Sequence, residues 1–329
     1  MNAALKENSI LLVAGYGGHS GYVYAVAIEL AKAGFRNSIF LVAEEYSFLA
    51  EKFKNLGRVY YQVLPRRPGE PLVKGLGRWI KAFFQSTQLI LNEHIKAVFA
   101  GGSNFSIPPS LIAMILRRAR VYTIEAIEHF SKPSRAVKFL EFFGAKVFLH
   151  WEEQLRMFPK GIVVGPVYEP PVYEPRDEGY VLVTTGTIGY KELFDSIERL
   201  RLDNVVMQTG DVDPEPYLRR NPSWKVFRYT SDIHRWIAGA SIVVTQQGVT
   251  AATASLAYGK PVIVVWNPRV VLGAPKNDVK IYAEKLEAVF IERSDVEELK
   301  RALELAHKPT RIYPNAARTI AKILVEELK

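Results

Sequence analysis

Short runs of β-branched and apolar residues alternate with amphipathic segments along the whole chain, and this alternation limits the possible fold more than any other feature. Strands separated by helical segments are typical of parallel sheets with crossover helices. The pattern therefore predicts the α/β class, with doubly wound sheets covered by helices on both faces. In the first half, the expected strands cover residues 10–14, 38–42, 59–63, 97–100, 121–124 and 146–149. In the second half, they cover residues 180–184, 204–207, 225–228, 241–244, 261–265 and 288–291.

A proline-rich segment separates the two series of strands. Residues 167–179 have no hydrophobic periodicity, which predicts a linker. We therefore expect two Rossmann-like domains, of residues 1–166 and 180–329, that face a cleft. The chain ends in two charged helical stretches, 296–306 and 315–328, and the last is a candidate to pack back on the first domain. Because ligands of doubly wound sheets bind beyond the carboxyl ends of the strands, the loops there are expected to carry the chemistry.

Composition excludes several classes of protein. The chain is 48% hydrophobic and 23% charged, which is typical of a folding sequence rather than a disordered one. It contains no cysteine, so disulfides and thiolate metal sites are excluded. The apolar stretch near the start is broken by glycines without a cleavage site, and the run at 107–116 is too short to span a bilayer. We therefore expect a soluble or peripheral protein.

The excess positive charge lies in the first half of the chain. Residues 1–160 hold 21 Lys and Arg against 12 Asp and Glu, so this part carries the whole net charge of +9. Such asymmetry indicates an anionic partner, which could be lipid headgroups, a nucleic acid or a phosphorylated substrate. A basic solvated surface without a partner is the alternative.

Two glycine-rich loops follow strands of the first half, GYGGHSG at 15–21 and GGSN at 101–104. Glycines let the backbone approach a ligand, and the helix N-terminus behind them favours phosphate. His19 is expected at a helix start, where its neutral form is favoured, and this suits either a general base or a helix cap. The candidates for binding phosphate or sugar are Gly17, Gly18, Ser20, Gly102, Ser103 and Asn104.

Glu125 ends the fifth expected strand, in the segment TIEAIEHF. A carboxylate at the carboxyl end of a central strand can orient a sugar hydroxyl or take its proton. A helix-capping acid is the alternative interpretation.

The loops of the second half offer neutral hydrogen-bonding groups. TTGTIG at 184–189 and TQQGVT at 245–250 follow strands, and backbone N–H groups there can bind a diphosphate. The DVD sequence at 211–213 imitates a metal–nucleotide motif, but the turn residues around it indicate a surface loop, so no metal is expected. The candidates for donor binding are Thr185, Gly186, Thr187, Tyr229, Thr230, Gln246, Gln247, Gly248, Val249 and Thr250.

A basic amphipathic segment lies at 65–91. Cations interleaved with apolar residues and an interfacial tryptophan indicate contact with a membrane surface. The alternative is that the apolar face packs on the sheet. The candidates for membrane contact are Arg66, Arg67, Lys74, Arg78, Trp79 and Lys81.

Together these motifs resemble the two-subunit eukaryotic UDP-GlcNAc transferase family that adds the second GlcNAc to dolichol-diphospho-GlcNAc, with both subunits in one chain. More distantly, the chain is similar to the bacterial MurG-type transferases. The resemblance covers nearly the whole chain. It rests on GGHSG, GLGRWIKAFFQSTQLILNEHIKAVFAGGSN, TIEAIEHF, FLHWEEQLRMFPKGIVVGPVY, VLVTTGTIGYKELFDSI and VVTQQGVTAATASLAYGKPVIVVWNP.

The resemblance implies a GT-B type glycosyltransferase that transfers GlcNAc with inversion, without a metal or cofactor. The donor, UDP-GlcNAc, would bind the second domain, and a polyisoprenyl (dolichyl) diphosphate-linked GlcNAc would bind the first domain in N-glycan precursor assembly. The resemblance implicates both His19 and Glu125 in taking the acceptor proton and does not say which is the base. It places the protein peripherally at the cytoplasmic face of the cell membrane, with a homo-oligomer as one possible state and no nucleic-acid partner.

Three positions depart from the family pattern. Gln246 stands where the family usually has histidine or arginine, and Ala254 stands where it has a glutamate that is often a ribose ligand. Asp278 and Val279 replace a His-Gln pair. Two alternatives therefore stay open: a nucleotide-sugar epimerase of the same fold, and a non-catalytic scaffold that binds a nucleotide sugar or a membrane. A nucleic-acid binder would explain the charge but not the paired glycine loops.

Overall fold

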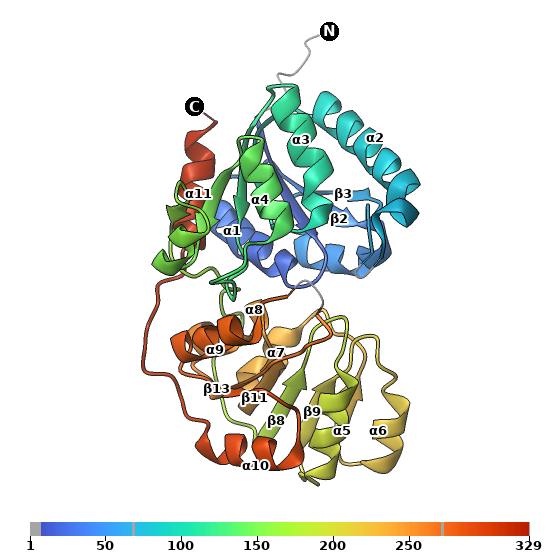
Figure 1. Cartoon of the computed structure of the whole chain (residues 1–329), viewed down its shortest axis with the longest axis vertical. Helices are drawn as coiled ribbons and strands as arrows, with labels where there is room; N and C mark the ends of the chain where they lie inside the picture. The colour runs from blue at the N-terminus through green and yellow to red at the C-terminus, as the bar shows by residue number, and fades with distance from the viewer. Residues whose placement is uncertain (1–7, 68–69, 271–272, 329) are drawn as a thin grey trace. The chain divides into compact units, whose positions relative to one another are not determined.

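The computed structural model describes residues 8–67, 70–270 and 273–328, and the chain divides into two compact units (Figure 1). Residues 1–7 and 329, which the expected domains include, lie outside the described residues. The first unit comprises Met1–Ile127, Ser131–Val167 and Asn315–Lys329, and the second comprises Glu128–Phe130 and Tyr168–Pro314.

The first unit is built on a seven-stranded parallel sheet with the order β3-β2-β1-β4-β5-β6-β7. Its strands are β1 (Ser9–Gly15), β2 (Ser38–Ala43), β3 (Arg58–Gln62), β4 (Ile95–Ala100), β5 (Arg120–Ile124), β6 (Lys146–Leu149) and β7 (Ile162–Val163). All residues of β1 and β2 are buried, as expected for a parallel sheet covered on both faces. The direction of strand order reverses between β1 and β4, which makes this the point where a ligand is expected.

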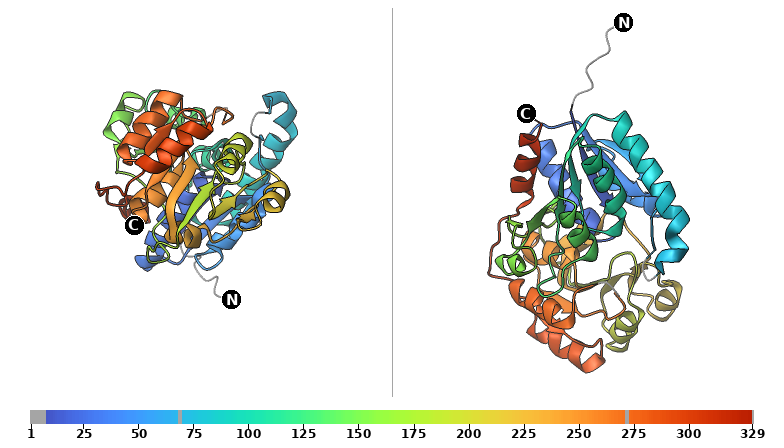
Figure 2. Two further views of the ribbon diagram at one scale, coloured as in Figure 1. Left: turned by 90° about the horizontal axis from the view of Figure 1, so that it is seen from below. Right: turned by 45° about the horizontal axis from the view of Figure 1, so that its top comes forward.

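Helices cover both faces of this sheet. The helices are α1 (His19–Lys32), α2 (Leu76–Asn92), α3 (Ile107–Ile115), α4 (Arg135–Phe142) and α11 (Ala317–Glu326), with 3-10 turns η1 (Glu44–Phe53), η2 (Leu72–Gly75), η3 (Asn104–Ser106) and η4 (Glu152–Arg156). Helices α2, α3 and α4 lie side by side over one face, and α1 packs against α11 over the other (Figures 1 and 2). The last helix of the chain is therefore part of the first unit.

The second unit repeats the topology with a six-stranded parallel sheet of order β10-β9-β8-β11-β12-β13. Its strands are β8 (Tyr180–Thr184), β9 (Val205–Gln208), β10 (Lys225–Phe227), β11 (Ala240–Gln246), β12 (Val262–Val265) and β13 (Val289–Ile291). Its helices are α5 (Lys191–Arg199), α6 (Glu215–Arg220), α7 (Ile233–Gly239), α8 (Val249–Ala252), the π-turn η5 (Thr253–Ala257), α9 (Lys276–Lys285) and α10 (Val296–Leu305). Here the strand order reverses between β8 and β11.

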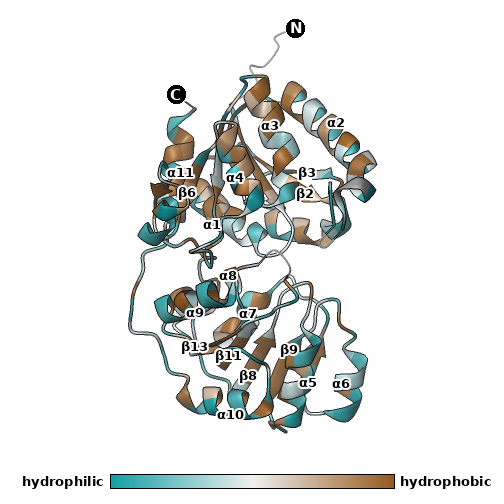
Figure 3. Cartoon of the chain, viewed as in Figure 1, coloured by the Kyte–Doolittle hydropathy of each residue, from teal (hydrophilic) through white to brown (hydrophobic). Residues whose placement is uncertain are grey.

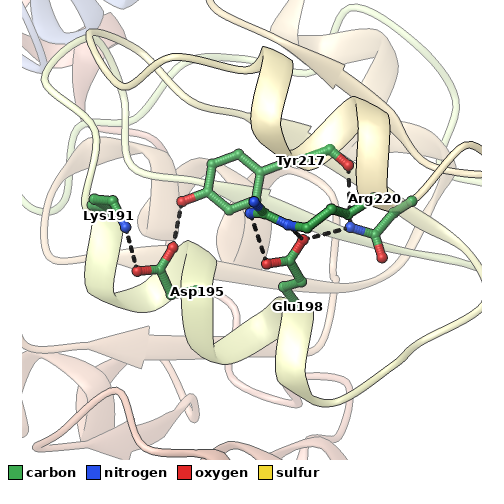
Figure 4. Close-up of polar contacts among 6 residues, drawn as sticks. Lys191, Asp195, Glu198, Tyr217 and Arg220 are labelled. Carbon is green, nitrogen blue, oxygen red and sulfur yellow. Dashed lines mark hydrogen bonds and ion pairs between the residues drawn. The ribbon is translucent and has the colours of Figure 1, made fainter.

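A polar network joins α5 to α6 on the surface of the second unit (Figure 4). Asp195 accepts hydrogen bonds from Lys191 Nζ at 2.5 Å and from the hydroxyl of buried Tyr217 at 2.7 Å. Burial opposes its ionisation, but these two hydrogen bonds outweigh burial and hold the pKa of Asp195 below its usual value. Arg220 binds both oxygens of Glu198, at 2.8 and 2.9 Å, and lies over the Tyr217 ring.

The predicted fold class is confirmed, and the observed strands fall within about two residues of their predicted positions. The sequence did not indicate β7, a two-residue strand that pairs with β6. Figure 3 shows apolar residues concentrated on the strands, whereas apolar and polar residues are mixed along the helices. Among the described residues, no helix combines the length and apolarity that crossing a membrane requires, and no group of acidic and histidine side chains is arranged to hold a metal ion.

Candidate functional site

The loop after β1 forms a tight turn into α1. Gly15 and Gly17 have φ of 61° and 62°, in the left-handed region that favours glycine. The hydroxyl of Ser20 donates a hydrogen bond to the Gly17 carbonyl at 2.7 Å and closes the turn. As a result, His19 is the first residue of α1, as the sequence predicted.

The loop after β4 lies directly against this turn. The Gly101 amide donates to the Val13 carbonyl at 3.1 Å, which extends the β1–β4 pairing by one bond. A Cβ at Gly101 would lie 2.9 Å from the His19 carbonyl, and one at Gly102 would lie 2.5 Å from the Ile124 carbonyl. Glycine is therefore required at both positions, because the ends of β1, β4 and β5 approach one another there.

His19 is fixed by this loop. Its Nδ1 lies 2.7 Å from the carbonyl oxygen of Gly101, and the side chain is half-buried. Since a carbonyl only accepts, Nδ1 carries the proton, and in the neutral ring Nε2 is then the basic nitrogen. This arrangement can serve a general base at the strand ends of the first unit.

Glu125 is completely buried at the end of β5. Its carboxylate accepts hydrogen bonds from the Ala126 amide at 2.8 Å, the Ser134 amide at 3.0 Å and the Ser134 hydroxyl. Ser134 is the N-cap of α4, so the negative charge lies at a helix N-terminus, where it is stabilised. This geometry matches the capping alternative and holds the loop between β5 and α4 in place.

His150 supports the same loop from β6. Its Nδ1 accepts a hydrogen bond from the Val167 amide at 3.0 Å, so Nε2 carries the proton and donates to the Glu125 carbonyl at 3.0 Å. Burial lowers the pKa of His150 to about 3, so the ring is neutral at physiological pH. His150 lies in the segment FLHWEEQLRMFPKGIVVGPVY, but the sequence did not single it out as a site residue.

The remaining candidates of the first unit lie at the same edge of its sheet. Ser103 is buried, whereas Gly17 and Gly18 are more accessible. Asn104 opens η3 and donates from Nδ2 to the Arg66 carbonyl at 3.2 Å, which joins the β4 loop to the segment after β3.

Helix α2 has two apolar faces. Its buried face presents Ala82, Ser86, Leu89 and Ile90. Spaced four residues apart on the exposed side, Leu76, Ile80 and Phe84 have exposed fractions of 63%, 65% and 62%. We call these three residues the α2 ridge.

The basic candidates near this ridge differ in their surroundings. Lys74 is exposed, and Lys81 is exposed but forms an ion pair with Glu44 at 3.4 Å. Trp79 is half-buried, and Arg78 is paired with Glu70. The packing alternative therefore accounts for one face of α2 and leaves the ridge open to solvent.

In the second unit, the ends of β8, β11 and β12 are linked by amide side chains. Gln246 donates from Nε2 to the Thr185 carbonyl at 2.9 Å and accepts from Asn267 Nδ2 at 2.7 Å. Gln247 exchanges two hydrogen bonds with the backbone of Asn267, at 3.1 and 3.3 Å. Gln246, at the position where the resembling family usually has histidine or arginine, therefore belongs to a network of neutral amides.

Two buried acceptor atoms lie beside this network. Gln208, at the end of β9, donates to the Gly186 carbonyl at 3.2 Å, which fixes the orientation of its amide. Within the described part of the chain, its Oε1 and the Oγ1 of Thr185 are buried without a hydrogen-bond partner. Buried polar atoms are normally satisfied, so a ligand or water is expected to complete them.

The loop before α8 is shaped by Gly248, which has φ of 130°. Its carbonyl accepts a hydrogen bond of 2.7 Å from the hydroxyl of Tyr282. Buried Val249 begins α8, which continues into the π-turn η5, and half-buried Thr250 follows it. Short π-helical segments within α-helices occur frequently at functional sites.

Tyr229 and Thr230 lie after β10 and are half-buried. Burial, followed by the Glu169 carboxylate, raises the pKa of Tyr229 to about 12. Glu169 also contacts His234 Nε2 at 2.8 Å. The segment expected as a linker thus contributes a carboxylate beside Tyr229.

At two of the three positions that depart from the family pattern, the side chain is buried inside the second unit. Ala254 is completely buried in η5. Asp278, in the first turn of α9, accepts a hydrogen bond from the Phe130 amide at 2.8 Å.

The sequence analysis missed Gln208 and Asn267. Gln208 ends β9 and Asn267 follows β12, so the rule that ligands bind beyond the carboxyl ends of the strands would have found both.

The second unit matches a known domain family. Residues 180–327 match the model of the glycosyltransferase family 28 C-terminal domain. Over nearly its whole length, the chain is similar to the UDP-N-acetylglucosamine–N-acetylmuramyl-(pentapeptide) pyrophosphoryl-undecaprenol N-acetylglucosamine transferase of Caldicellulosiruptor saccharolyticus. The identity is 24% over 373 residues, which cover 98% of this chain and 100% of that protein.

A match to human UDP-N-acetylglucosamine transferase subunit ALG13 is partial, with 29% identity over 27% of this chain and 9% of that protein. The resemblance to the MurG-type transferases is therefore confirmed, whereas the resemblance to a fused eukaryotic two-subunit enzyme is not.

Solved structures show the same fold. The structure of Acinetobacter baumannii MurG superposes with a TM-score of 0.62 at 16% identity, covering 97% of this chain and 99% of that chain. The UDP-GlcNAc 2-epimerase of Methanocaldococcus jannaschii superposes with a TM-score of 0.61 at 13% identity, covering 97% and 99%. The predicted GT-B type fold is confirmed, and because transferases and epimerases share it, the fold does not decide between them.

Proposed function

We propose that the chain is an inverting glycosyltransferase that moves GlcNAc from UDP-GlcNAc to GlcNAc carried on a polyisoprenyl diphosphate. The observation that carries the donor and the lipid-diphosphate carrier of this proposal is the full-length similarity to a transferase whose name specifies both. GlcNAc as the acceptor sugar rests on the resemblance of the sequence motifs to the eukaryotic family. The match of residues 180–327 to a glycosyltransferase domain agrees with a donor site in the second unit.

His19 is the general base in this proposal. The acceptor hydroxyl oxygen forms a bond to the anomeric carbon of GlcNAc while the bond from that carbon to the β-phosphate oxygen of UDP breaks. The hydroxyl proton passes to Nε2 of His19, and UDP leaves with the bonding electron pair. Glu125 is a positioning residue, because its carboxylate is buried and already accepts three hydrogen bonds.

Neutral groups stabilise the leaving diphosphate in the second unit. The backbone N–H groups around Thr187 and at the start of α8 donate hydrogen bonds to phosphate oxygens. The amide network of Gln246 and Asn267 fixes the Thr185 backbone for this role. No metal or cofactor takes part in the proposed reaction.

The α2 ridge supports a position of the protein at a membrane surface. Three large apolar side chains on an exposed helix face, beside the cations Lys74 and Lys81, suit an interface with anionic lipids. We propose peripheral binding at the cytoplasmic face of the cell membrane, where a lipid-linked acceptor is accessible.

A second candidate acceptor is N-acetylmuramyl-pentapeptide on the same type of lipid. The name of the Caldicellulosiruptor relative specifies it. The two acceptors differ in the lactyl-peptide substituent of the first sugar. The acceptor that the protein uses therefore decides between N-glycan precursor assembly and peptidoglycan synthesis.

The test is transfer from radiolabelled UDP-GlcNAc, with EDTA present, to phytanyl-diphospho-GlcNAc and to the corresponding muramyl-pentapeptide lipid. We expect a disaccharide-lipid from the first acceptor, and a loss of rate of about 10²–10⁴-fold in His19→Ala, the usual contribution of a general base. His94→Ala, which changes an exposed histidine of the same unit, is the matched control.

The other outcomes identify the alternatives. Product from the muramyl acceptor alone would assign the second function. Conversion of UDP-GlcNAc to its 2-epimer without acceptor would show an epimerase, and UDP binding without any turnover would leave a scaffold.

A further inference from the structure

Two adjacent arginines after β3 have different surroundings. Arg66 is half-buried, and its Nε donates a hydrogen bond to the Glu70 carbonyl. Arg67 is exposed, and its backbone amide binds the Glu70 carboxylate at 3.1 Å. The sequence had grouped both as membrane contacts, but only Arg67 has the solvent exposure that this role requires.

The charge of Arg66 is not neutralised by its neighbour Glu70. The Glu70 carboxylate forms an ion pair with Arg78, whose hydrogen bond is the main cause that lowers the pKa of Glu70. Arg66 uses only the backbone carbonyl of Glu70. Within the described ranges, no side chain or carbonyl accepts a hydrogen bond from its two terminal nitrogens.

Arg66 lies at the same sheet edge as the glycine loops. Its carbonyl accepts the 3.2 Å hydrogen bond from Asn104, which follows Gly102 and Ser103 in the β4 loop. Its charge acts on the hydroxyl of Tyr16 in the β1 loop: burial and then Tyr46 raise the pKa of Tyr16 to about 12, and Arg66 opposes them. A Cβ at Gly15 would lie 3.3 Å from Ser103 Oγ, so the two loops are in contact.

The same place holds an unsatisfied acceptor. The Oδ1 of Asn104 is buried and has no hydrogen-bond partner among the described residues. Its orientation is set by the bond from Nδ2 to a carbonyl, so Oδ1 needs an O–H or N–H donor. A ligand that offers both an anion for Arg66 and a hydroxyl for Asn104 has the chemistry of a sugar diphosphate.

We propose that Arg66 binds the diphosphate of the lipid-linked acceptor, held in position by Asn104, and that Arg67 contacts the membrane instead. This inference rests on the proposed function for the identity of the acceptor. Arginine presents paired N–H donors to phosphate oxygens, which gives it an advantage over a point charge. Arg66 therefore distinguishes a diphosphate from a phospholipid headgroup at the surface.

The test measures binding of soluble probes without a membrane, so it does not depend on turnover. The affinities for farnesyl diphosphate and farnesyl monophosphate are compared in the wild type, Arg66→Gln, Arg66→Lys and Arg67→Gln. We expect Arg66→Gln to bind the diphosphate at least about tenfold more weakly and to lose its preference over the monophosphate, a change typical of a charge-assisted hydrogen bond. Arg66→Lys should recover part of the affinity.

Arg67→Gln makes the same change of charge one residue away. We expect it to bind the diphosphate within about twofold of the wild type and to bind anionic phosphatidylglycerol vesicles more weakly, because each basic residue near such a surface contributes roughly 1 kcal/mol. Arg66→Gln should bind those vesicles as the wild type does. Thermal unfolding of both variants checks that neither has lost the fold.

The inference is overturned if Arg66→Gln binds the diphosphate as the wild type does, if Arg67→Gln loses as much affinity, or if the wild type does not bind the probe. Failure of the proposed function has a different signature. In that case the probe is bound through Arg66, but no disaccharide-lipid forms from UDP-GlcNAc.

Discussion

His150 makes the first unit sensitive to acid. Its ring is completely buried, and burial lowers its pKa to about 3 from an ordinary value of 6.5. The unfolded chain binds a proton at His150 below pH 6.5, whereas the folded chain does not until about pH 3. Stability is therefore lost as pH falls from about 6.5, and the loss is complete near the folded pKa.

The size of the loss follows from the two pKa values. Each pH unit below the unfolded pKa costs about 1.4 kcal/mol until the folded pKa is reached. Between pH 7 and pH 5, His150 should therefore lower the free energy of unfolding by about 2 kcal/mol. The residue is fully buried, so solvent screening does not reduce this figure.

The variant His150→Gln isolates this contribution. Glutamine offers an N–H to the Glu125 carbonyl and an oxygen to the Val167 amide, and it does not titrate. Urea unfolding followed by circular dichroism at pH 7 and pH 5 should show that the stability difference between wild type and variant shifts by about 2 kcal/mol in favour of the variant. In parallel, NMR titration should find no protonation of His150 above about pH 4.

A control and a refuting result complete the experiment. His94→Gln, which makes the same substitution at an exposed histidine of the same unit, is the matched control. If the difference for His150→Gln is the same at both pH values, or if the His150 ring titrates near 6.5, the assignment of a neutral buried ring is wrong.

Three further changes test other parts of the molecule. Phe84→Ser on the α2 ridge should weaken binding to anionic vesicles by about tenfold, since burying a phenylalanine contributes roughly 1.5–3 kcal/mol; unchanged cosedimentation would contradict a membrane role for the ridge. Tyr217→Phe removes the hydroxyl bound to Asp195 and should lower the free energy of unfolding by about 2 kcal/mol in denaturant titrations, and a neutral result would show that the network in Figure 4 adds no stability. Gln208→Ala should raise the KM for UDP-GlcNAc by about tenfold with a smaller effect on kcat, while an unchanged KM would exclude contact with the donor.

Much of the fold was predictable because it depends on local patterns. The run at the start of the chain is continuously apolar, as a strand buried on both faces must be, and β1 occupies it. In contrast, β7 comprises only Ile162 and Val163, and it exists because Val163 pairs with Leu149. A two-residue strand has no periodicity of its own, so only the tertiary pairing defines it.

The candidate site was predictable to the level of the loops. The spacing of glycines placed His19 at a helix start, which is a local property of the chain. Its tautomer depends on the Gly101 carbonyl, and this contact exists only because β1 and β4 are neighbours in the sheet. Similarly, the surroundings of Arg66 depend on Asn104, a residue distant in sequence. The residue types were visible in sequence, but the contacts that assign their roles come from the strand order.

The structure shows the surroundings of two residues that depart from the family pattern, Ala254 and Asp278. At position 254, an alanine that is completely buried leaves no side chain for a ribose hydroxyl. At position 278, the aspartate is occupied by the Phe130 amide. In the proposed function, donor recognition therefore rests on other polar groups of the second unit, and the buried Thr185 Oγ1 and Gln208 Oε1 can accept hydrogen bonds from donor hydroxyl groups. Because a pocket that offers hydrogen-bond acceptors rejects analogues without the matching hydroxyl, we expect removal of a ribose or sugar hydroxyl from the donor to cost this chain more than removal of a phosphate charge.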